Sequence, residues 1–388
     1  MKRCDVVVIG LGIMGSAALW NLAEAGITVL GIEGGGPTHT GGSSHGGTRI
    51  FRRAYWEGEK YIGLLNRAHE LWTALQDKTG RRLIIPTGGV FIGPRAAGVV
   101  AGSQRTAIAD DIPHEMWDAA RIRERLPAFQ VTDDMQAIYE PAAYAIAAEE
   151  ARLQMVNEAV RGAGTAWYGD PVESLGSTPH DVTVRTRSGQ VVQAAAAVVT
   201  VGPWMGRRLV PELRPHLVPN RVPIYWFSPR PGRMEDFDHK RFPVFLYECQ
   251  DGSLLYGIAA GTSAEQGVKI GFHNRQHVPA DPDTAIPRVT DHQRQEIASY
   301  VAQIFPDLEP SPIDARLCYY TMSTDESFLI GASAQSPRVV YASACSGHGF
   351  KFATAIGEAL AFLAQQKPPP VELSAFGAAR FDAASRVT

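Results

Sequence analysis

Cysteine is scarce in this sequence, and its spacing is not that of a metal site or a disulfide framework. The 388 residues contain four cysteines and no CxxC pair: Cys4, Cys249, Cys318 and Cys345. This usage is typical of a reduced, cytoplasmic protein, and it leaves each thiol free for chemistry. Histidine does not cluster either. His273 and His277 have helical spacing, but the pattern around them is extended, so we expect no metal site.

Long apolar runs and a strong net charge are missing as well. No apolar run approaches the ~18 residues that a membrane-spanning helix needs. The formal net charge of −3 gives no reason to expect nucleic acid or an anionic membrane as a partner. Lys2 and Arg3 precede an apolar run as in a signal peptide, but Asp5 and later glycines interrupt it. Because this run also forms the first strand of the site described next, we reject a cleaved leader.

The start of the sequence carries the pattern of a dinucleotide site. The apolar residues 6–9 lead into Gly10-x-Gly12-x-x-Gly15, a small-residue helix follows, and a second apolar run ends on Glu33. One glycine permits a tight turn, one lets the backbone approach a pyrophosphate, and one lets the helix lie close to the strand. The helix N-terminus favours the phosphates, and Glu33 has the spacing needed to bind a ribose.

The rest of the chain alternates between helical and strand-like stretches. Periodicity predicts helices at 59–76, 149–162, 291–304 and 351–365, and strands at 182–186 and 196–201. Residues 221–271 are aromatic, turn-rich and strand-like, which is typical of an antiparallel sheet. We therefore predict a two-lobed α/β fold. A discontinuous, Rossmann-like FAD-binding domain comprises 1–85, 145–220 and 315–388, and an inserted, mainly antiparallel substrate-binding domain comprises 86–144 and 221–314. Such interleaving favours FAD over NAD, because the flavin end needs a second lobe as a lid.

Five segments stand out in order along the chain: Gly10-x-Gly12-x-x-Gly15, His45 to Tyr55, Lys269 to His273, Cys318 to Glu326, and Ser346 to Phe352. Together they resemble the monomeric sarcosine oxidase and N-methyltryptophan oxidase family of flavoprotein amine oxidases. The resemblance covers nearly the full length. It implies FAD, oxidation of a secondary-amine amino acid, reoxidation by O2 to hydrogen peroxide, and a monomer.

The glycine motif and the resemblance together predict the residues that hold the cofactor. They are Gly10, Gly12, Ile13, Met14, Gly15, Glu33, Ser43, His45, Thr48, Arg49, Val172, Gly202, Cys318, Gly347, Gly349 and Lys351. Arg49 would lie over the flavin and favour its anionic reduced form. The resemblance also shows two departures, since Gly47 stands where the sarcosine enzymes tend to carry Asp and Ser44 where a second His often occurs. These could alter attachment or pocket polarity without abolishing FAD binding.

The resemblance implies that Cys318 carries the flavin through a thioether to the methyl carbon on the benzenoid ring. Attachment needs a thiolate at the flavin edge, and a nearby cation such as Arg49 would help to form it. The alternative for Cys318 is a buried strand cysteine, which is the commoner fate of a free thiol. Cys345, beside a glycine turn, is the rival attachment site.

The resemblance places Arg52 and Lys351 at the substrate carboxylate. A guanidinium offers a bidentate fork and a lysine a point charge, so the pair could orient an α-amino acid over the flavin. The alternative for Arg52 is a solvated charge or a structural salt bridge to Glu57. The alternative for Lys351 is an ordinary lysine in the first turn of a helix, a position that its charge disfavours.

The remaining predicted residues surround the reacting atoms. The resemblance makes Lys269 the residue that activates O2, because a fixed ammonium stabilises the negative charge that develops on oxygen. His273 and Tyr256 correspond to residues that contact or position the amine, and Tyr320 corresponds to a pocket residue. The alternative for Lys269 is a lysine on an edge strand. The alternative for His273 and Tyr256 is an ordinary buried polar side chain.

Two other functions fit the same sequence. One is an FAD-dependent dehydrogenase of a hydroxy or amino acid that passes electrons to an acceptor other than oxygen. The other is a flavin-binding protein without catalysis of its own. The presence of Arg52, Lys269 and Lys351, which correspond to catalytic and substrate-binding residues, argues against it.

Overall fold

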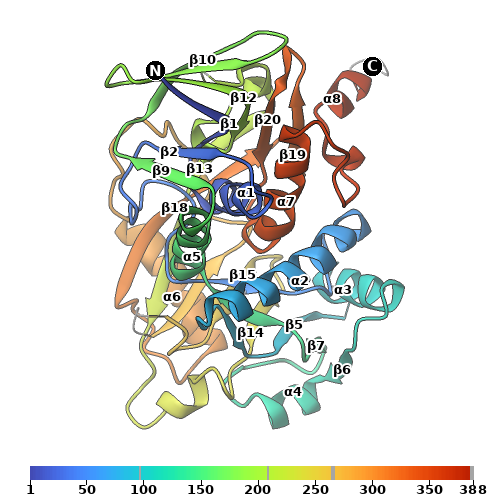
Figure 1. Ribbon diagram of the computed structural model, residues 1–388. Helices are drawn as coiled ribbons and strands as arrows, with labels where there is room; N and C mark the ends of the chain where they lie inside the picture. The colour runs from blue at the N-terminus through green and yellow to red at the C-terminus, as the bar shows by residue number, and fades with distance from the viewer. Residues whose placement is uncertain (96–97, 208, 264–266, 385–388) are drawn as a thin grey trace.

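The computed structural model describes the chain except for residues 96–97, 208, 264–266 and 385–388. Its described residues form two large sheets and one small one, with helices outside them (Figure 1). This is the expected α/β architecture, which is confirmed. No helix among these residues is both long enough and apolar enough to cross a membrane.

The first sheet is the Rossmann-like one. Its strands are, in order, β10 (Val172–Ser177), β11 (Val182–Thr186), β12 (Val191–Val199), β1 (Lys2–Ile9), β2 (Val29–Glu33) and β9 (Gly164–Tyr168), with β20 (Ser336–Ser343) beside β12 and β19 (Leu329–Ser333) beside β20. The central strands β20, β12, β1, β2 and β9 are parallel. Parallel strands are covered on both faces, which explains the continuous apolar run of β1 from Val6 to Ile9.

The second sheet is antiparallel except where β5 meets β14. Its order is β17 (Val278–Pro279), β13 (Leu217–Phe227), β16 (Val268–Phe272), β15 (Leu254–Ile258), β14 (Val244–Glu248), β5 (Gly89–Pro94), β7 (Met135–Glu140) and β6 (Glu115–Asp118), with β18 (Asp314–Ser323) also beside β13. A small sheet of β3 (Thr48–Phe51), β8 (Tyr144–Ala147) and β4 (Ile84–Pro86) completes the set.

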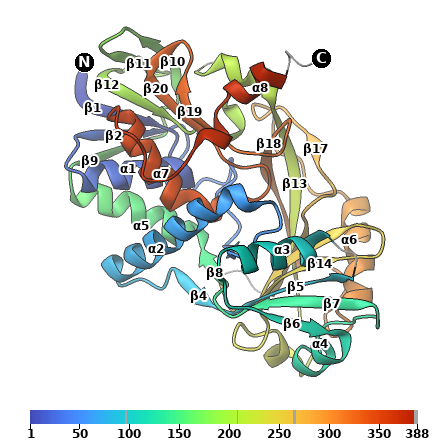
Figure 2. The same ribbon diagram turned by 90° about the vertical axis from the view of Figure 1, so that its right-hand side faces the viewer.

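Two long strands join the two parts of the molecule. β13 and β18 lie side by side and run between them (Figure 2), paired from Leu217 with Ser323 to Trp226 with Asp314. Residues 314–323 therefore lie in the second sheet, although the predicted boundary assigns 315–323 to the cofactor domain. The division of the chain into domains stays a prediction.

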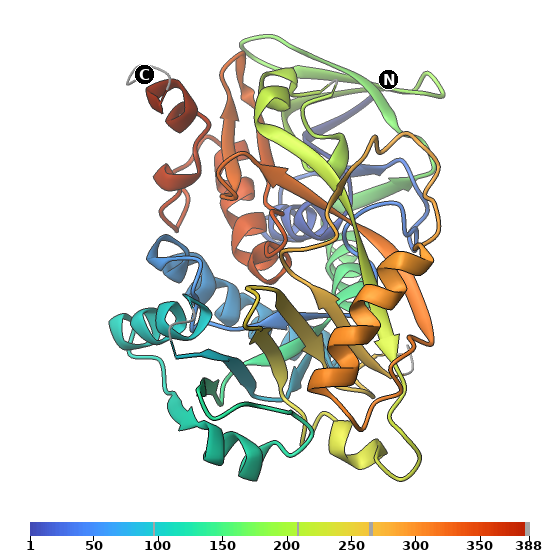
Figure 3. The same ribbon diagram turned by 180° about the vertical axis from the view of Figure 1, so that it is seen from behind.

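The helices are α1 (Ile13–Glu24), α2 (Ile62–Thr79), α3 (Gly98–Ala109), α4 (Ala119–Arg125), α5 (Ala148–Arg161), α6 (Asp291–Ile304), α7 (Ala353–Ala364) and α8 (Ala379–Ala384). Short 3-10 turns are η1 (Glu59–Tyr61), η2 (Gly202–Trp204), η3 (Pro211–His216), η4 (Met234–Phe237), η5 (Phe350–Phe352) and η6 (Ser374–Phe376). α6 begins at a capping box of Thr290 and Gln293 and lies against the second sheet (Figure 3). Its side chains Ile297 and Val301 are buried in the core of that sheet.

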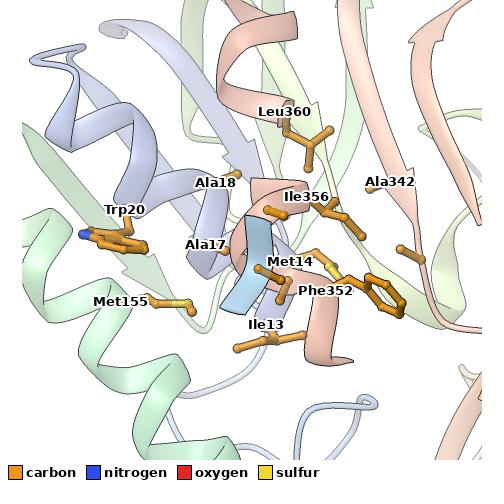
Figure 4. Packing of buried hydrophobic residues seen from close by; sticks show 14 of the residues in the cluster. Ile13, Met14, Ala17, Ala18, Trp20, Met155, Ala342, Phe352, Ile356 and Leu360 are labelled. Carbon is orange, nitrogen blue, oxygen red and sulfur yellow. The ribbon is translucent and has the colours of Figure 1, made fainter. Parts of the chain in front are cut away.

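α1 is the central helix of the cofactor half, and it lies between α5 and α7. Figure 4 shows Met155 of α5 on one side of Ala17 and Ile356 of α7 on the other. The approach to α7 is close, because a Cβ on Gly357 would lie 2.4 Å from the Cβ of Ala17. Small residues on both helices therefore allow α1 and α7 to pack closely. This packing fixes the position of α1 and of the turn at its N-terminus.

Candidate active site

A cavity of about 1000 Å³ lies where the three sheets meet. The first sheet contributes the turn after β1, the end of β2, and the segment that follows β20. The second sheet contributes side chains of β13, β15 and β18, and the small sheet contributes β3. This volume is at the upper end of the range for cofactor and ligand sites.

The turn between β1 and α1 closes one end of the cavity. Gly10 adopts a φ of +88°, which disfavours any side chain. A Cβ on Gly15 would lie 1.8 Å from the Gly10 carbonyl oxygen, so only glycine lets α1 start this close to the strand. The Ile13 amide donates to the Ser44 hydroxyl at 3.0 Å. The turn is therefore rigid, and it presents a helix N-terminus to the cavity.

Glu33 ends β2 beside this turn. Its carboxylate accepts hydrogen bonds from the amides of Leu11 (2.8 Å) and Gly35 (2.9 Å) and lies 3.5 Å from His39. Burial alone would raise the pKa of Glu33, but the contact with His39 and the hydrogen bonds from Gly35 and Leu11 lower it below its usual value. The carboxylate is thus ionised and fixed in place, as a ribose contact requires.

Arg152 of α5 is a cavity residue that the sequence did not reveal. It is only 3% exposed and donates to the carbonyl oxygens of Leu11 and Pro37. It reaches the cavity because α5 packs on α1, which is a tertiary contact with no local sequence signal.

Three charged side chains hold the loop before and into β3. Glu149 accepts from the amides of Gly46 and Gly47. Arg49 donates to the carbonyl oxygens of Ser43, His45 and Thr48 at 2.8 Å, and Lys269 donates to those of Gly46 and Thr48 at 2.8 Å. Anchoring both the amides and the carbonyls leaves this loop little freedom.

Cys318 lies on β18 against this loop. Its sulfur is 3.8 Å from Nη2 of Arg49, and the residue is 2% exposed. Burial would raise the pKa of Cys318, but His45, Arg49 and Lys269 outweigh it and lower the pKa to about 7. Burial instead raises the pKa of Cys345. At neutral pH the nucleophilic thiolate is therefore much more populated at Cys318.

Two buried cations also line the cavity. Arg52 is 3% exposed and Lys351 is 5% exposed. Nη2 of Arg52 donates to both carboxylate oxygens of Glu57, at 2.6 and 2.7 Å, and this salt bridge is one of the alternatives raised for Arg52 from sequence. Burial would raise the pKa of Glu57, but Arg52, His348 and Lys351 lower it to about 2. One carboxylate thus leaves the two cations with an excess positive charge.

Lys351 is the more weakly ionised of the two. Its ammonium donates to the His348 carbonyl oxygen at 2.7 Å and lies 4.9 Å from the ring centre of Tyr55. Burial and the neighbouring charge of Arg52 lower the pKa of Lys351 to about 7, against the opposing effect of Glu57. A bound anion would therefore favour the charged form of this lysine.

Neutral polar side chains line the same cavity. Tyr256 of β15 and Tyr320 of β18 are inward-facing, and His273 directly follows β16. Burial lowers the pKa of His273 to about 4 and raises that of Tyr256 to about 12. Both groups are therefore uncharged at neutral pH and can hydrogen-bond an amine without repelling it.

The structure brings together all the predicted site residues except three around this one cavity. Gly15 lies beneath the first turn, Lys269 lies behind the loop that it anchors, and His45 is buried behind Cys318. Sequence reasoning did not identify Glu149, Arg152 or His348. Among the described residues, no group of three or more His, Cys, Asp or Glu side chains could hold a metal ion.

A family model described as FAD dependent oxidoreductase (DAO) matches residues 5–363. The chain belongs to this family. It is 36% identical over 361 residues to a monomeric sarcosine oxidase of Streptomyces avermitilis, covering 93% of each chain. It is also 36% identical over 379 residues to an N-methyl-L-tryptophan oxidase of Yersinia pestis, covering 97% of this chain and 99% of the relative.

Solved structures show the same fold at lower identity. NikD, an amino acid oxidase of nikkomycin biosynthesis, superimposes with a TM-score of 0.84 at 22% identity, covering 97% of this chain and 98% of NikD. The L-proline dehydrogenase of P. horikoshii gives a TM-score of 0.83 at 18% identity, covering 99% of each chain. The match over whole chains confirms the two-lobed architecture of FAD dependent oxidoreductases.

The cavity fits the FAD of this family. Hydroxyl groups of Ser43, Thr321 and Ser343 are buried at its wall and have no hydrogen-bond partner within the described part of the chain. Buried polar groups are normally satisfied, so these are positions where a polar cofactor would bind. The fixed carboxylate of Glu33 and the glycine turn are suited to the ribose and the pyrophosphate of a dinucleotide.

Proposed function

We propose that this protein is an FAD-dependent oxidase of secondary-amine amino acids, such as N-methyl or cyclic amino acids. It uses O2 as electron acceptor and releases hydrogen peroxide and an imine that hydrolyses. The observation that carries the proposal is the buried pair of Arg52 and Lys351 in the same cavity as the glycine turn and Cys318. The names of the relatives, sarcosine oxidase and N-methyl-L-tryptophan oxidase, support the same substrate class.

Arg52 and Lys351 would bind the substrate carboxylate. Their excess positive charge lies within a closed site, where a charge-assisted contact is stronger than in water. With the carboxylate fixed, the amine and its α-substituent extend toward Tyr256, His273 and Tyr320. Because burial keeps His273 uncharged, the amine can lie beside it in the neutral form that oxidation requires.

The chemistry that FAD would supply when bound is the acceptance of a hydride equivalent and the transfer of both electrons to O2. The chain supplies orientation and fixed charge for this chemistry. Arg49 and Lys269 bring two cations to the loop before β3, and both would stabilise negative charge on the reduced cofactor and on oxygen. Cys318, with its lowered pKa and its place on the cavity wall, would hold the flavin covalently.

The proposal is tested with a panel of sarcosine, N-methyl-L-tryptophan, L-proline and pipecolate in air. We expect hydrogen peroxide from at least one of them, in equal amount to the oxygen consumed. The primary amino acid glycine is the matched control for sarcosine and should react much more slowly. A panel that yields no peroxide would exclude an oxidase of this class.

A dehydrogenase with another electron acceptor is the second function that this cavity could support. Replacing Lys269 by Met distinguishes the two, with Lys269→Arg as the control that keeps the charge. In an oxidase, Lys269→Met should slow reoxidation by O2 strongly while reduction by substrate is retained. In a dehydrogenase, O2 reacts slowly in the wild type and the substitution changes little.

We further expect a monomer that acts in the cytoplasm. The name of one relative, monomeric sarcosine oxidase, supports a monomer, and four unpaired cysteines are typical of a reducing compartment.

A further inference from the structure

A chain of hydrogen bonds leads from Lys351 to the protein surface. The Lys351 ammonium lies 3.4 Å from the Tyr55 hydroxyl, which lies 2.6 Å from Nδ1 of His348. On the other side of the ring, Nε2 of His348 lies 3.3 Å from the carbonyl oxygen of Glu326. Lys351 and Tyr55 are buried, whereas Glu326 is in an exposed turn. The chain therefore connects the cation in the cavity with solvent.

The direction of each hydrogen bond follows from its outer end. A carbonyl oxygen can only accept, so Nε2 of His348 must carry the proton that it donates to Glu326. Burial lowers the pKa of His348 to about 3, so the neutral ring has a bare Nδ1. Nδ1 then accepts from the Tyr55 hydroxyl, whose oxygen is left to accept from Lys351. All donors point outward, from the lysine toward the surface.

Aromatic packing holds the His348 ring in this orientation. The ring stacks on Phe328 with a centroid distance of 4.8 Å, and Tyr61 meets it edge-on at 5.3 Å. Phe352 packs at 6.3 Å. One ring nitrogen consequently faces Tyr55 and the other faces the carbonyl oxygen of Glu326. A proton relay requires this geometry.

We propose that Tyr55 and His348 are positioning residues that carry a proton between Lys351 and solvent while a carboxylate covers the cavity. The inference rests on the proposed function, in which Lys351 binds the substrate carboxylate. In the outward direction Lys351 gives a proton to the Tyr55 oxygen, Tyr55 gives its own to Nδ1 of His348, and Nε2 gives its proton to water at the Glu326 turn. Each transfer breaks one N–H or O–H bond and forms another, so that one proton leaves and His348 is left with its proton on Nδ1. The reverse sequence charges the lysine when a carboxylate binds.

The titratable and charged groups around Lys351 come from four elements. They are Arg52, Tyr55 and Glu57 from the segment after β3, Tyr61 from η1, His273 from the end of β16, and His348 from the turn before η5. With pKa values of about 2 for Glu57, 4 for His273 and 3 for His348, these three do not titrate near neutrality. Proton uptake by this cluster near pH 8 therefore reports Lys351.

The test uses the FAD-loaded enzyme and propionate, a carboxylate with no amine, in weakly buffered solution at about pH 8, well above the pKa of any carboxylic acid. Rapid mixing follows the flavin absorbance, which reports binding, and an indicator dye, which reports proton uptake. In the wild type both signals should change together. In Tyr55→Phe and His348→Phe, which keep the aromatic packing, binding should stay fast and proton uptake should slow by on the order of a hundredfold or more.

The controls separate the path from packing and from the proposed function. Tyr61→Phe removes a hydroxyl beside the same ring and should leave uptake synchronous with binding, whereas Lys351→Met should abolish uptake. Proton uptake that stays synchronous with binding in both Tyr55→Phe and His348→Phe would overturn the path. A wild type that binds propionate without taking up a proton would overturn it too, and so would a wild type that does not bind propionate. A wild type that takes up the proton but oxidises no secondary amine would defeat the proposed function alone.

Discussion

At the scale of single residues, the site depends on a few buried charges whose neighbours set their ionisation. Cys318 shows this most clearly, because burial and cationic neighbours act on it in opposite directions. The neighbours prevail, and the pKa falls from the ordinary range of a thiol to about 7. Cys345 lacks this advantage, since burial raises its pKa.

We predict that covalent flavin attachment follows the ionisation of Cys318. The thiolate forms above its pKa, so the attachment rate after mixing apoprotein with FAD should rise with pH to about 7 and then level off. Flavin that stays with the denatured protein measures attachment. Cys345→Ser should behave as wild type, and persistent attachment in Cys318→Ala would show that another residue carries the flavin.

The ion pair between Arg52 and Glu57 leads to a second prediction. Lys351 binds a carboxylate when charged, so the dissociation constant of propionate should rise by about tenfold per pH unit above a pKa of about 7. The pH above which the dissociation constant begins to rise is the break in this profile. Glu57→Gln removes the negative charge that favours the ionised form of Lys351, so the break should move to lower pH. Binding well below the break should become tighter, because Arg52 loses its competing partner.

The exposed neighbour Glu59 supplies the control for this experiment. Glu59→Gln should leave both the affinity and the position of the break unchanged. A pH profile of Glu57→Gln that coincides with the wild type would mean that Glu57 does not influence the anion site.

At the scale of elements, local sequence predicted the helices well where capping and periodicity agree. The helix expected at 291–304 is α6 with the same bounds, because Thr290 caps it and its apolar face is regular. The helix expected from Lys351 instead starts as the 3-10 turn η5, and α7 begins at Ala353. The N-cap residue there is Gly349, which has no side chain to cap the helix. The first residues after this glycine turn therefore form a 3-10 turn, which is wound more tightly than an α-helix.

The contact between α1 and α7 gives a prediction at this scale. A Cβ on Gly357 would lie 2.4 Å from Ala17, so Gly357→Ala should destabilise the protein by ~1–3 kcal/mol through overpacking. Thermal unfolding with equal FAD content measures the loss. Gly63→Ala, in the exposed first turn of α2 with nothing within 4 Å, is the matched control and should stabilise by ~0.5–1 kcal/mol. Equal effects of the two substitutions would contradict close packing at Gly357.

At the scale of the whole molecule, the sequence predicted which residues line the cavity but not every tertiary contact that brings them together. Nearly all the site residues predicted from the resemblance and the glycine motif line the cavity. The pairing of β18 with β13, and of β3 with β8, could not be predicted, because register depends on partners far along the chain. Glu149, Arg152 and His348 were missed for the same reason, since each acts through tertiary contacts.

The cavity draws on all three sheets, so the cofactor should stabilise the molecule as a unit. We expect FAD added to non-covalent Cys318→Ala at a hundred times its dissociation constant to raise the free energy of unfolding by about 2.7 kcal/mol. Denaturant titration at several FAD concentrations measures the effect. An unfolding midpoint independent of FAD would show that the cofactor does not bind this cavity.

The central claim, oxidation of a secondary-amine amino acid by FAD in this cavity, is tested most directly by anaerobic titration of the yellow protein. Sarcosine, N-methyl-L-tryptophan or L-proline should bleach the flavin absorbance without oxygen, and admitting air should restore the colour and produce hydrogen peroxide. A flavin that stays yellow with every secondary amine, or that stays bleached in air, would contradict the account.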